Sequence, residues 1–301
     1  MSPISLFLQP GTLSPSIRRQ AAHALERGAL VPIETAQTTL DDAGVRFLVR
    51  QVSSLADKAR ARGAKPSSPV DPFLPHDPDL FVADISATHF ALLNKFNVID
   101  HHLLIVTRAF EEQNALLTLA DFTAWCACLA EFDGLGFYNG GPEAGASQRH
   151  KHMQIVPLPL GDAGEALPID PLIRTARATP DIGTLAGLPF AHAFARLAPA
   201  APEAAAHASL DAYRRLLKAV GIEAVDVNGQ AHQSAPYNLL VTPRWMLLVP
   251  RSAEQADGVS VNALGFAGSL FVRDAGQMDT VQRLGPMTVL QRVAKPLPVH
   301  R

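Results

Sequence analysis

Residues 149–157 read RHKHMQIVP, and this stretch decides the fold that we expect. It combines apolar residues with a closing proline, a pattern typical of a short β-strand. Because side chains alternate along a strand, His150, His152 and Gln154 share one face, whereas Lys151 and the residues that alternate with it share the other. The stretch therefore predicts a strand that presents three polar groups side by side.

The segment before this strand, residues 134–148, is dense in glycine and carries Asn139, Ser147 and Gln148. A polar strand face often does no more than meet solvent, and for a single histidine that is the commoner outcome. Glycine, however, lets backbone N–H groups approach phosphate oxygens closely, and Ser, Asn and Gln side chains add neutral donors. We interpret the segment as an anion-binding loop beside the histidines.

A histidine next to a bound phosphate can attack phosphorus through a neutral ring nitrogen, provided that an acceptor keeps the other nitrogen protonated. The product is a phosphoramidate, whose labile P–N bond lets the group pass to a second acceptor. A divalent cation commonly screens the polyphosphate, although the protein need not supply a ligand cluster. We therefore expect a divalent cation, most simply Mg²⁺, bound with the nucleotide, no metal site made by the protein, and no organic cofactor.

The string YNGGPEAGASQRHKHMQ, residues 138–154, resembles the histidine-triad signature in its transferase form, His-x-His-x-Gln. It is most similar to the ATP adenylyltransferases, also called diadenosine tetraphosphate phosphorylases. Blocks similar to that family follow in the same order at residues 92–113, 235–252 and 261–274, and the resemblance spans residues 47–273. It implies a histidine-triad-like α+β fold, an antiparallel β-sheet flanked by helices.

The same resemblance implies roles for individual residues. His152 is the nucleophile that takes the adenylyl group, Gln154 donates to the α-phosphate, and His150 orients the site. The implied substrate contacts are Lys58 over the polyphosphate, Asn94 and Lys95 at the nucleoside, Asn139 with Gly145, Ala146, Ser147 and Gln148 at the phosphates, and Asn262, Gly268 and Arg273 at the second nucleotide half. Two positions depart from the family pattern: Arg273 stands where lysine is frequent, and the middle residue of the triplet at 139–141 is glycine where serine is frequent.

The remaining periodicities place further elements around the motif. We predict strands at residues 45–52, 80–85, 89–96, 102–107, 238–241 and 245–249, and helices at 15–28, 118–134, 209–221 and beyond 276 with a break at Pro286. Residues 1–160 form an N-terminal adenylyltransferase region with the motif, and residues 161–204 an Ala/Pro-rich connection. Residues 205–301 form a C-terminal region that completes the same compact unit.

Composition limits the class of protein. The chain has 301 residues, 48% hydrophobic and 18% charged, which excludes a disordered protein. A net charge of -2 gives no reason to expect a nucleic acid as partner. Lys95, Arg149, Lys151 and Arg273 nevertheless lie in or beside the motifs, so local charge can still bind a small anion.

No stretch approaches the roughly 20 apolar residues of a membrane span, and the first residues lack a signal-peptide pattern. Cys126 and Cys128 lie two residues apart in a predicted helix, which favours a structural role in a reducing compartment over a metal or redox role. We expect a cytoplasmic protein, a monomer or small homo-oligomer, whose partners are nucleotides and phosphate, without nucleic acid or membrane.

A few other residues have two interpretations. His101 and His102 precede an apolar strand, where a structural or supporting role is the commoner one. The segment PFLPHDP, residues 72–78, most simply makes a rigid turn, although it could place Phe73 against a base. Trp245 fits the core better than a ligand site.

The expected reaction is reversible phosphorolysis of diadenosine tetraphosphate to ATP and ADP through an adenylyl-His152 intermediate, with adenylyl sulfate as a side substrate. Two alternatives stay open. A hexose-1-phosphate uridylyltransferase shares His-x-His-x-Gln, but such enzymes usually place proline where Lys151 stands and often bind zinc. A non-catalytic nucleotide-binding protein is the second.

Overall fold

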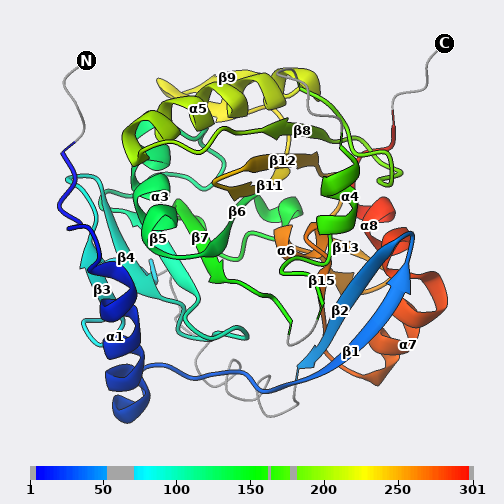
Figure 1. The fold of residues 1–301 in the computed structure, drawn as a ribbon, viewed down its shortest axis with the longest axis horizontal. Coiled ribbons are helices and arrows are strands. Elements are labelled where there is room, and N and C mark those ends of the chain that lie inside the picture. The colour runs from blue at the N-terminus through cyan, green and yellow to red at the C-terminus, as the bar shows by residue number, and fades with distance from the viewer. Residues whose placement is uncertain (1–4, 53–70, 162–163, 177–181, 298–301) are drawn as a thin grey trace.

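The computed structural model describes residues 5–52, 71–161, 164–176 and 182–297. Within this part of the chain, the largest sheet has eight strands, all paired antiparallel (Figure 1). Their spatial order is β3 (Phe81–Asp84), β4 (His89–Leu93), β5 (Leu103–Thr107), β7 (His152–Pro157), β6 (Gly134–Gly140), β11 (Tyr237–Thr242), β12 (Trp245–Pro250) and β8 (Ala193–Arg196). Because β6 pairs with β11, the sheet joins strands from both halves of the chain.

Smaller elements surround this sheet. A second sheet of three strands contains β1 (Thr35–Asp42), β2 (Val45–Val52) and β15 (Ser269–Val272), the last paired parallel to β2. Two short hairpins are formed by β9 (Ala224–Val227) with β10 (Gln230–Gln233), and by β13 (Gln255–Ala256) with β14 (Val259–Ser260). The described helices are α1 (Leu13–Arg27), α3 (Leu119–Glu131), α4 (Asp170–Thr175), α5 (Pro202–Ala219), α6 (Ala263–Phe266), α7 (Ala275–Leu284) and α8 (Pro286–Val293), and η1 (Pro142–Ala144) is a single 3-10 turn.

The predicted α+β architecture with a flanked antiparallel sheet is confirmed. Local signals account for several boundaries: α1 ends at Gly28 in the left-handed conformation, α3 begins with a capping box between Thr118 and Asp121, and Pro286 opens α8 after the break. Such caps satisfy backbone groups that the helix itself leaves unpaired.

The glycine-dense segment is only partly a loop, which corrects our prediction. Its first residues form the buried strand β6, and the preceding helix ends at Glu131, before Gly134. A side chain at Gly136 would place its Cβ 2.6 Å from Nε1 of Trp125 on α3. Glycine is needed here because the helix packs directly against the strand.

Within residues 161–204, which we predicted to be a connection, the described part of the chain contains the elements α4 and β8. The helix α4 lies within them, and β8 pairs antiparallel with β12 at the edge of the large sheet. The helix expected at 209–221 also begins earlier, at Pro202.

The two faces of the large sheet pack against different partners. On one face, α1, α3 and α5 bury alternate strand residues such as Ile105, Met153 and Leu239 (Figure 1). On the other face, α6, α7, α8 and the β1–β2–β15 sheet cover residues such as Phe137 and Leu247 near one end of the strand order. A small cluster around Phe73 covers β4 and β5 near the other end. The face opposite the helices α1, α3 and α5 is therefore covered in two parts, and the motif strand β7 lies between them.

Candidate active site

An open cleft of about 1090 Å³ lies on this second face of the sheet. Its walls come from the β4–β5 region on one side and from residues 254–277 on the other. The predicted site residues that line it are Asn94, Lys95, Asn139, Gly145, Ser147, Gln148, His152, Gln154, Asn262 and Arg273. Large concave sites with a few convergent polar groups are the usual places for small ligands.

His152 is held as a neutral imidazole with a defined tautomer. Its Nδ1–H donates to the carbonyl oxygen of His150 at 2.8 Å, so the lone pair of the neutral ring is on Nε2. The side chain is 4% exposed, and burial lowers the pKa of His152 to about 4 despite the opposing hydrogen bond to His150. At neutral pH the ring can therefore act as a nucleophile.

Gln113 fixes the backbone of His152. Its Oε1 accepts from the backbone N–H of His152 at 2.9 Å, and its Nε2 donates to the carbonyl of the same residue at 3.3 Å. The Gln113 side chain is itself buried. No residue-type pattern in the sequence identified Gln113, because its partner is 39 positions away.

His150 acts through its backbone, since its ring is turned away from the cleft. The ring nitrogens lie 2.7 Å from Oδ2 of Asp71 and 2.9 Å from the carbonyl oxygen of Thr107. Asp71 also accepts from the backbone N–H of Phe73 at 2.9 Å, which ties the proline-rich turn to the motif strand. The Phe73 ring lies 5.1 Å from the ring of His152, centroid to centroid, and lines the cleft.

Gln154 is oriented by a short hydrogen-bonded chain. Its Oε1 accepts from Nε2–H of His102 at 2.8 Å, and Nδ1 of His102 accepts from the Asn94 amide at 3.1 Å. Burial lowers the pKa of His102 to about 4, so this ring is neutral and has the one donor and one acceptor that the chain requires. Because the oxygen of Gln154 is engaged, its NH₂ group remains as the donor for a ligand.

The phosphate loop rests against the C-terminal half of the chain. Oδ1 of Asn139 accepts from Nδ2 of Asn238 and from the backbone N–H of Ala263, both at 2.9 Å. Gly145 has a φ of 86°, and a Cβ there would lie 3.0 Å from the carbonyl oxygen of Val261. Glycine is thus required by both the backbone conformation and the close approach.

Two cationic residues expected to favour an anion are used elsewhere. Lys151 is 0% exposed on the helical face, where its Nζ lies 2.7 Å from Glu111 and 3.3 Å from Asp121. Arg149 pairs with Glu112 at the surface. Lys151 belongs to the opposite face of the strand, as alternation requires, so its assignment to the anion site was wrong.

Other predicted residues occupy different places. Gly268 packs against Pro168, 2.4 Å from a would-be Cβ, and Ala146 is in the loop but does not line the cleft. Asn262, which lines the cleft, also caps α6 by accepting from Leu264 N–H at 3.0 Å. Lys58 lies outside the described residues.

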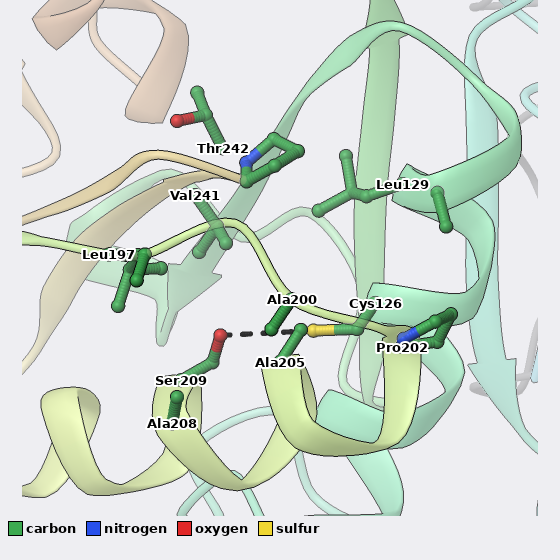
Figure 2. Close-up of a pocket in the computed structure, with 13 residues that line it drawn as sticks. Cys126, Leu129, Leu197, Ala200, Pro202, Ala205, Ala208, Ser209, Val241 and Thr242 are labelled. Carbon is green, nitrogen blue, oxygen red and sulfur yellow. Dashed lines mark hydrogen bonds between the residues drawn. The ribbon is translucent and has the colours of Figure 1, made fainter.

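The two cysteines lie on the helical face, remote from this chemistry. A gap of about 60 Å³ lies between α3 and α5. Sγ of Cys126 lies 3.8 Å from Oγ of Ser209 there, and both side chains are labelled in Figure 2. Burial raises the pKa of both thiols, that of Cys126 to about 11, so neither is a thiolate at neutral pH. Trp245 is buried in the core, as expected.

No group of three or more His, Cys, Asp or Glu side chains among the described residues could hold a metal ion. None of the helices in the same residues is long and apolar enough to cross a membrane.

A neutral buried histidine beside a phosphate-type loop, on an antiparallel sheet flanked by helices, defines a nucleotidyl-transferring protein with a histidine-triad-like fold. The chain belongs to the Ap4A phosphorylase family: residues 4–175 match the family model described as Ap4A phosphorylase N-terminal domain. Residues 186–296 match the model described as ATP adenylyltransferase C-terminal domain.

Curated relatives agree with this assignment. Diadenosine 5′,5‴-P1,P4-tetraphosphate phosphorylase 2 of Saccharomyces cerevisiae is 27% identical over 261 residues, which are 78% of this chain and 79% of the relative. Protein APA1 of the same organism is 28% identical over 293 residues, 88% of each chain.

Solved structures match the fold over nearly the whole length. The crystal structure of yeast Ap4A phosphorylase Apa2 has a TM-score of 0.80 at 24% identity, and covers 96% of this chain and 99% of that chain. The same yeast protein in complex with Ap4A gives a TM-score of 0.77 at 23% identity, with coverage of 96% and 99%.

Proposed function

We propose that this chain catalyses the reversible phosphorolysis of diadenosine tetraphosphate to ATP and ADP, with His152 as the covalent nucleophile. The observation that carries the proposal is the state of His152 inside the cleft. The carbonyl of His150 holds the proton on Nδ1, and burial lowers the pKa to about 4, so Nε2 offers a lone pair at neutral pH. Family membership supplies the substrate class.

In the first step Nε2 of His152 attacks one terminal, α-type phosphorus of the substrate. The P–N bond forms as the bond from that phosphorus to the bridging oxygen breaks, and ATP leaves. The ring becomes positively charged, and its Nδ1–H stays bonded to the His150 carbonyl, which stabilises that charge. The NH₂ of Gln154 is the donor available to the phosphoryl oxygens.

In the second step an oxygen of inorganic phosphate attacks the adenylyl phosphorus. The P–N bond breaks, ADP leaves, and the electron pair returns to Nε2. Gln154 cannot titrate as a third histidine could, so it neither activates water nor protonates a leaving group, and phosphate is the preferred acceptor. Comparing wild type with Gln154→His, using water and labelled phosphate as acceptors, tests this point. Unchanged partitioning would contradict it.

A divalent cation is proposed to accompany the polyphosphate. Among the described residues that line the cleft, two carry carboxylates, Asp77 and Glu254, which are too few for a complete ligand set, so phosphate oxygens and water would supply most ligands to Mg²⁺. EDTA should therefore lower turnover of the nucleotide without changing the thermal stability of the free protein. A lower melting temperature in EDTA alone would instead indicate a resident metal.

The deciding experiment incubates the protein with diadenosine tetraphosphate, with and without phosphate, and separates the products. ATP plus ADP that appear only with phosphate support the proposal, whereas two ADP, or AMP plus ATP, mean hydrolysis. Without phosphate, mass spectrometry should detect an adenylylated protein in wild type and not in His152→Ala. Turnover by His152→Ala at the wild-type rate would favour a histidine-independent role.

Adenylyl sulfate presents a similar α-phosphorus, and we include it as a side substrate, with sulfate as its leaving group. The same assay tests this, because sulfate release should require His152. UDP-glucose is tested as a substrate in the same assay, and its turnover would favour the uridylyltransferase alternative. We also retain a cytoplasmic location and a monomer or small homo-oligomer as proposals, to be tested by fractionation and by light scattering.

A further inference from the structure

Arg251 is a buried cation whose surroundings have no assigned role in the reaction. It follows β12, is 0% exposed, and its guanidinium donates to the carbonyl oxygens of Val261 at 2.8 Å and Val293 at 3.2 Å. It also donates to Oδ1 of Asn238, a side chain buried to 1% exposure on β11. Buried charges are costly, so such an arrangement demands a reason.

Asn238 connects Arg251 to the phosphate loop through hydrogen bonds. Because its oxygen faces Arg251, its Nδ2 is directed the other way, where it donates to Oδ1 of Asn139 at 2.9 Å and to the carbonyl of Ala144 at 2.8 Å. Asn238 and Asn139 are direct partners in the pairing of β11 with β6. The two amides therefore form a chain that begins at a fixed positive charge.

The last amide of this chain lies at the wall of the cleft. Oδ1 of Asn139 accepts two hydrogen bonds, from Asn238 and from Ala263 N–H, and Asn139 lines the cleft. A carboxamide can rotate by half a turn with almost no change in shape, and the reversed form would present oxygen instead of NH₂ to an anion. Something must therefore select one orientation.

We propose that Asn238 and Arg251 are positioning residues that hold the side-chain NH₂ of Asn139 toward the substrate phosphates. This inference rests on the proposed function. Arg251 and the Ala144 carbonyl set the direction of the Asn238 amide, and Asn238 acts with Ala263 N–H to set the direction of the Asn139 amide. A donor aimed at a phosphate in a partly desolvated cleft stabilises both the bound polyphosphate and the charge that develops during transfer.

Asn238→Asp is the informative variant, because it preserves shape and keeps an acceptor for Arg251. The new carboxylate, however, places an oxygen where Nδ2 had donated to Asn139 and Ala144. The carboxylate then attracts the NH₂ of Asn139 toward position 238, whereas Ala263 N–H still favours the oxygen there, so the Asn139 amide loses its single preferred orientation. We expect the single-turnover rate of adenylylation by diadenosine tetraphosphate to fall by about tenfold to a hundredfold.

A double-variant cycle separates positioning from a structural effect. In the Asn139→Ala background there is no amide to orient, so adding Asn238→Asp should change the adenylylation rate less than about twofold. Leu240→Val is the matched control, since Leu240 is buried on the same strand and pairs with Phe137 and Leu247 rather than with Asn139. It should lower the melting temperature without lowering this rate.

The outcomes are distinct. An equal loss of rate from Asn238→Asp with and without Asn139 would overturn the inference, as would a wild-type rate in Asn238→Asp. Arg251→Lys, which keeps the charge but loses the planar fork, should lower the rate in the presence of Asn139 and not in its absence. If Arg251→Lys does not fold, the Asn238 cycle still decides the proposal. Absence of adenylylation in wild type would instead refute the proposed function.

Discussion

The protonation state of His152 gives the sharpest prediction. Burial lowers its pKa to about 4, against 6.5 for an exposed histidine, and the hydrogen bond to the His150 carbonyl only partly opposes this shift. In the proposed reaction the neutral ring is the nucleophile, so the reaction should be insensitive to acid until the pH approaches 4. The perturbation is a change of pH alone, from 7.5 to 5.5, on wild-type protein.

The magnitude follows from the fraction of neutral imidazole. With a pKa of about 4, roughly 97% of His152 is neutral at pH 5.5, whereas a pKa of 6.5 would leave roughly 9%. The value of kcat/KM reports ionisations of the free enzyme. We therefore expect adenylylation to slow by less than about 1.2-fold over this range, and an unperturbed histidine would give about a tenfold loss.

The assay is the first half-reaction, with diadenosine tetraphosphate and no added phosphate. The release of ATP is measured in a stopped-flow or quench instrument. This choice matters because the substrate has no terminal phosphate that titrates between pH 5 and 8, whereas inorganic phosphate does. Circular dichroism at each pH confirms that the fold persists. An apparent pKa near 6.5 in the kcat/KM profile would refute the reasoning, since it would mean that the nucleophile is solvated.

Three further predictions concern the buried polar groups. Lys151→Met should lower the free energy of unfolding by about 3–5 kcal/mol, because buried Asp121 loses the Lys151 ammonium and, among the described residues, keeps only His89 as a partner that can carry a positive charge. Adding Asp121→Asn should recover more than half of that loss in urea titrations, and strictly additive losses would contradict the coupling. His102→Leu should lower kcat by about tenfold with little change in melting temperature, because Gln154 loses the donor that orients its amide. An unchanged kcat would show that other contacts orient the Gln154 amide. Since burial lowers the pKa of His102 and His152 to about 4, the unfolded chain binds protons below pH 6.5 that the folded chain does not, so stability present above pH 6.5 is lost as the pH falls toward 4. Each histidine should account for about 2 kcal/mol of the loss at pH 5, and His102→Gln should remove about half of this pH dependence in denaturant titrations.

Much of the fold could be predicted because its signals are local. Alternation along residues 149–157 placed His152 and Gln154 on one face, and the capping box at Thr118 marked the start of α3. The antiparallel strands 89–93 and 103–107 followed from short apolar runs. In the glycine-dense segment the local signal misled, because glycine in β6 serves the close packing of Trp125 rather than a turn.

The sequence placed the proposed nucleophile in the motif strand, but it did not identify the residues that orient it. The hydrogen bonds that orient the site join residues far apart in the chain, such as Gln113 with His152, and Asn139 with Ala263, 124 positions away. One signal was available: an asparagine within the apolar run at 237–242 must find a partner once it is buried. The sequence alone does not show that the partners of this residue, Asn238, are Arg251 and Asn139.

The sequence by itself determined which candidate residues share one face of the motif strand, because side-chain direction depends only on the backbone period. It did not determine the protonation of the histidines, the orientation of the amides or the partners of the cationic side chains. Lys151 faces buried carboxylates, and His152 is neutral at pH 7, because the tertiary structure sets solvent exposure and hydrogen-bond partners. Those quantities depend on elements that meet only when the β6–β11 pair joins the two halves of the chain.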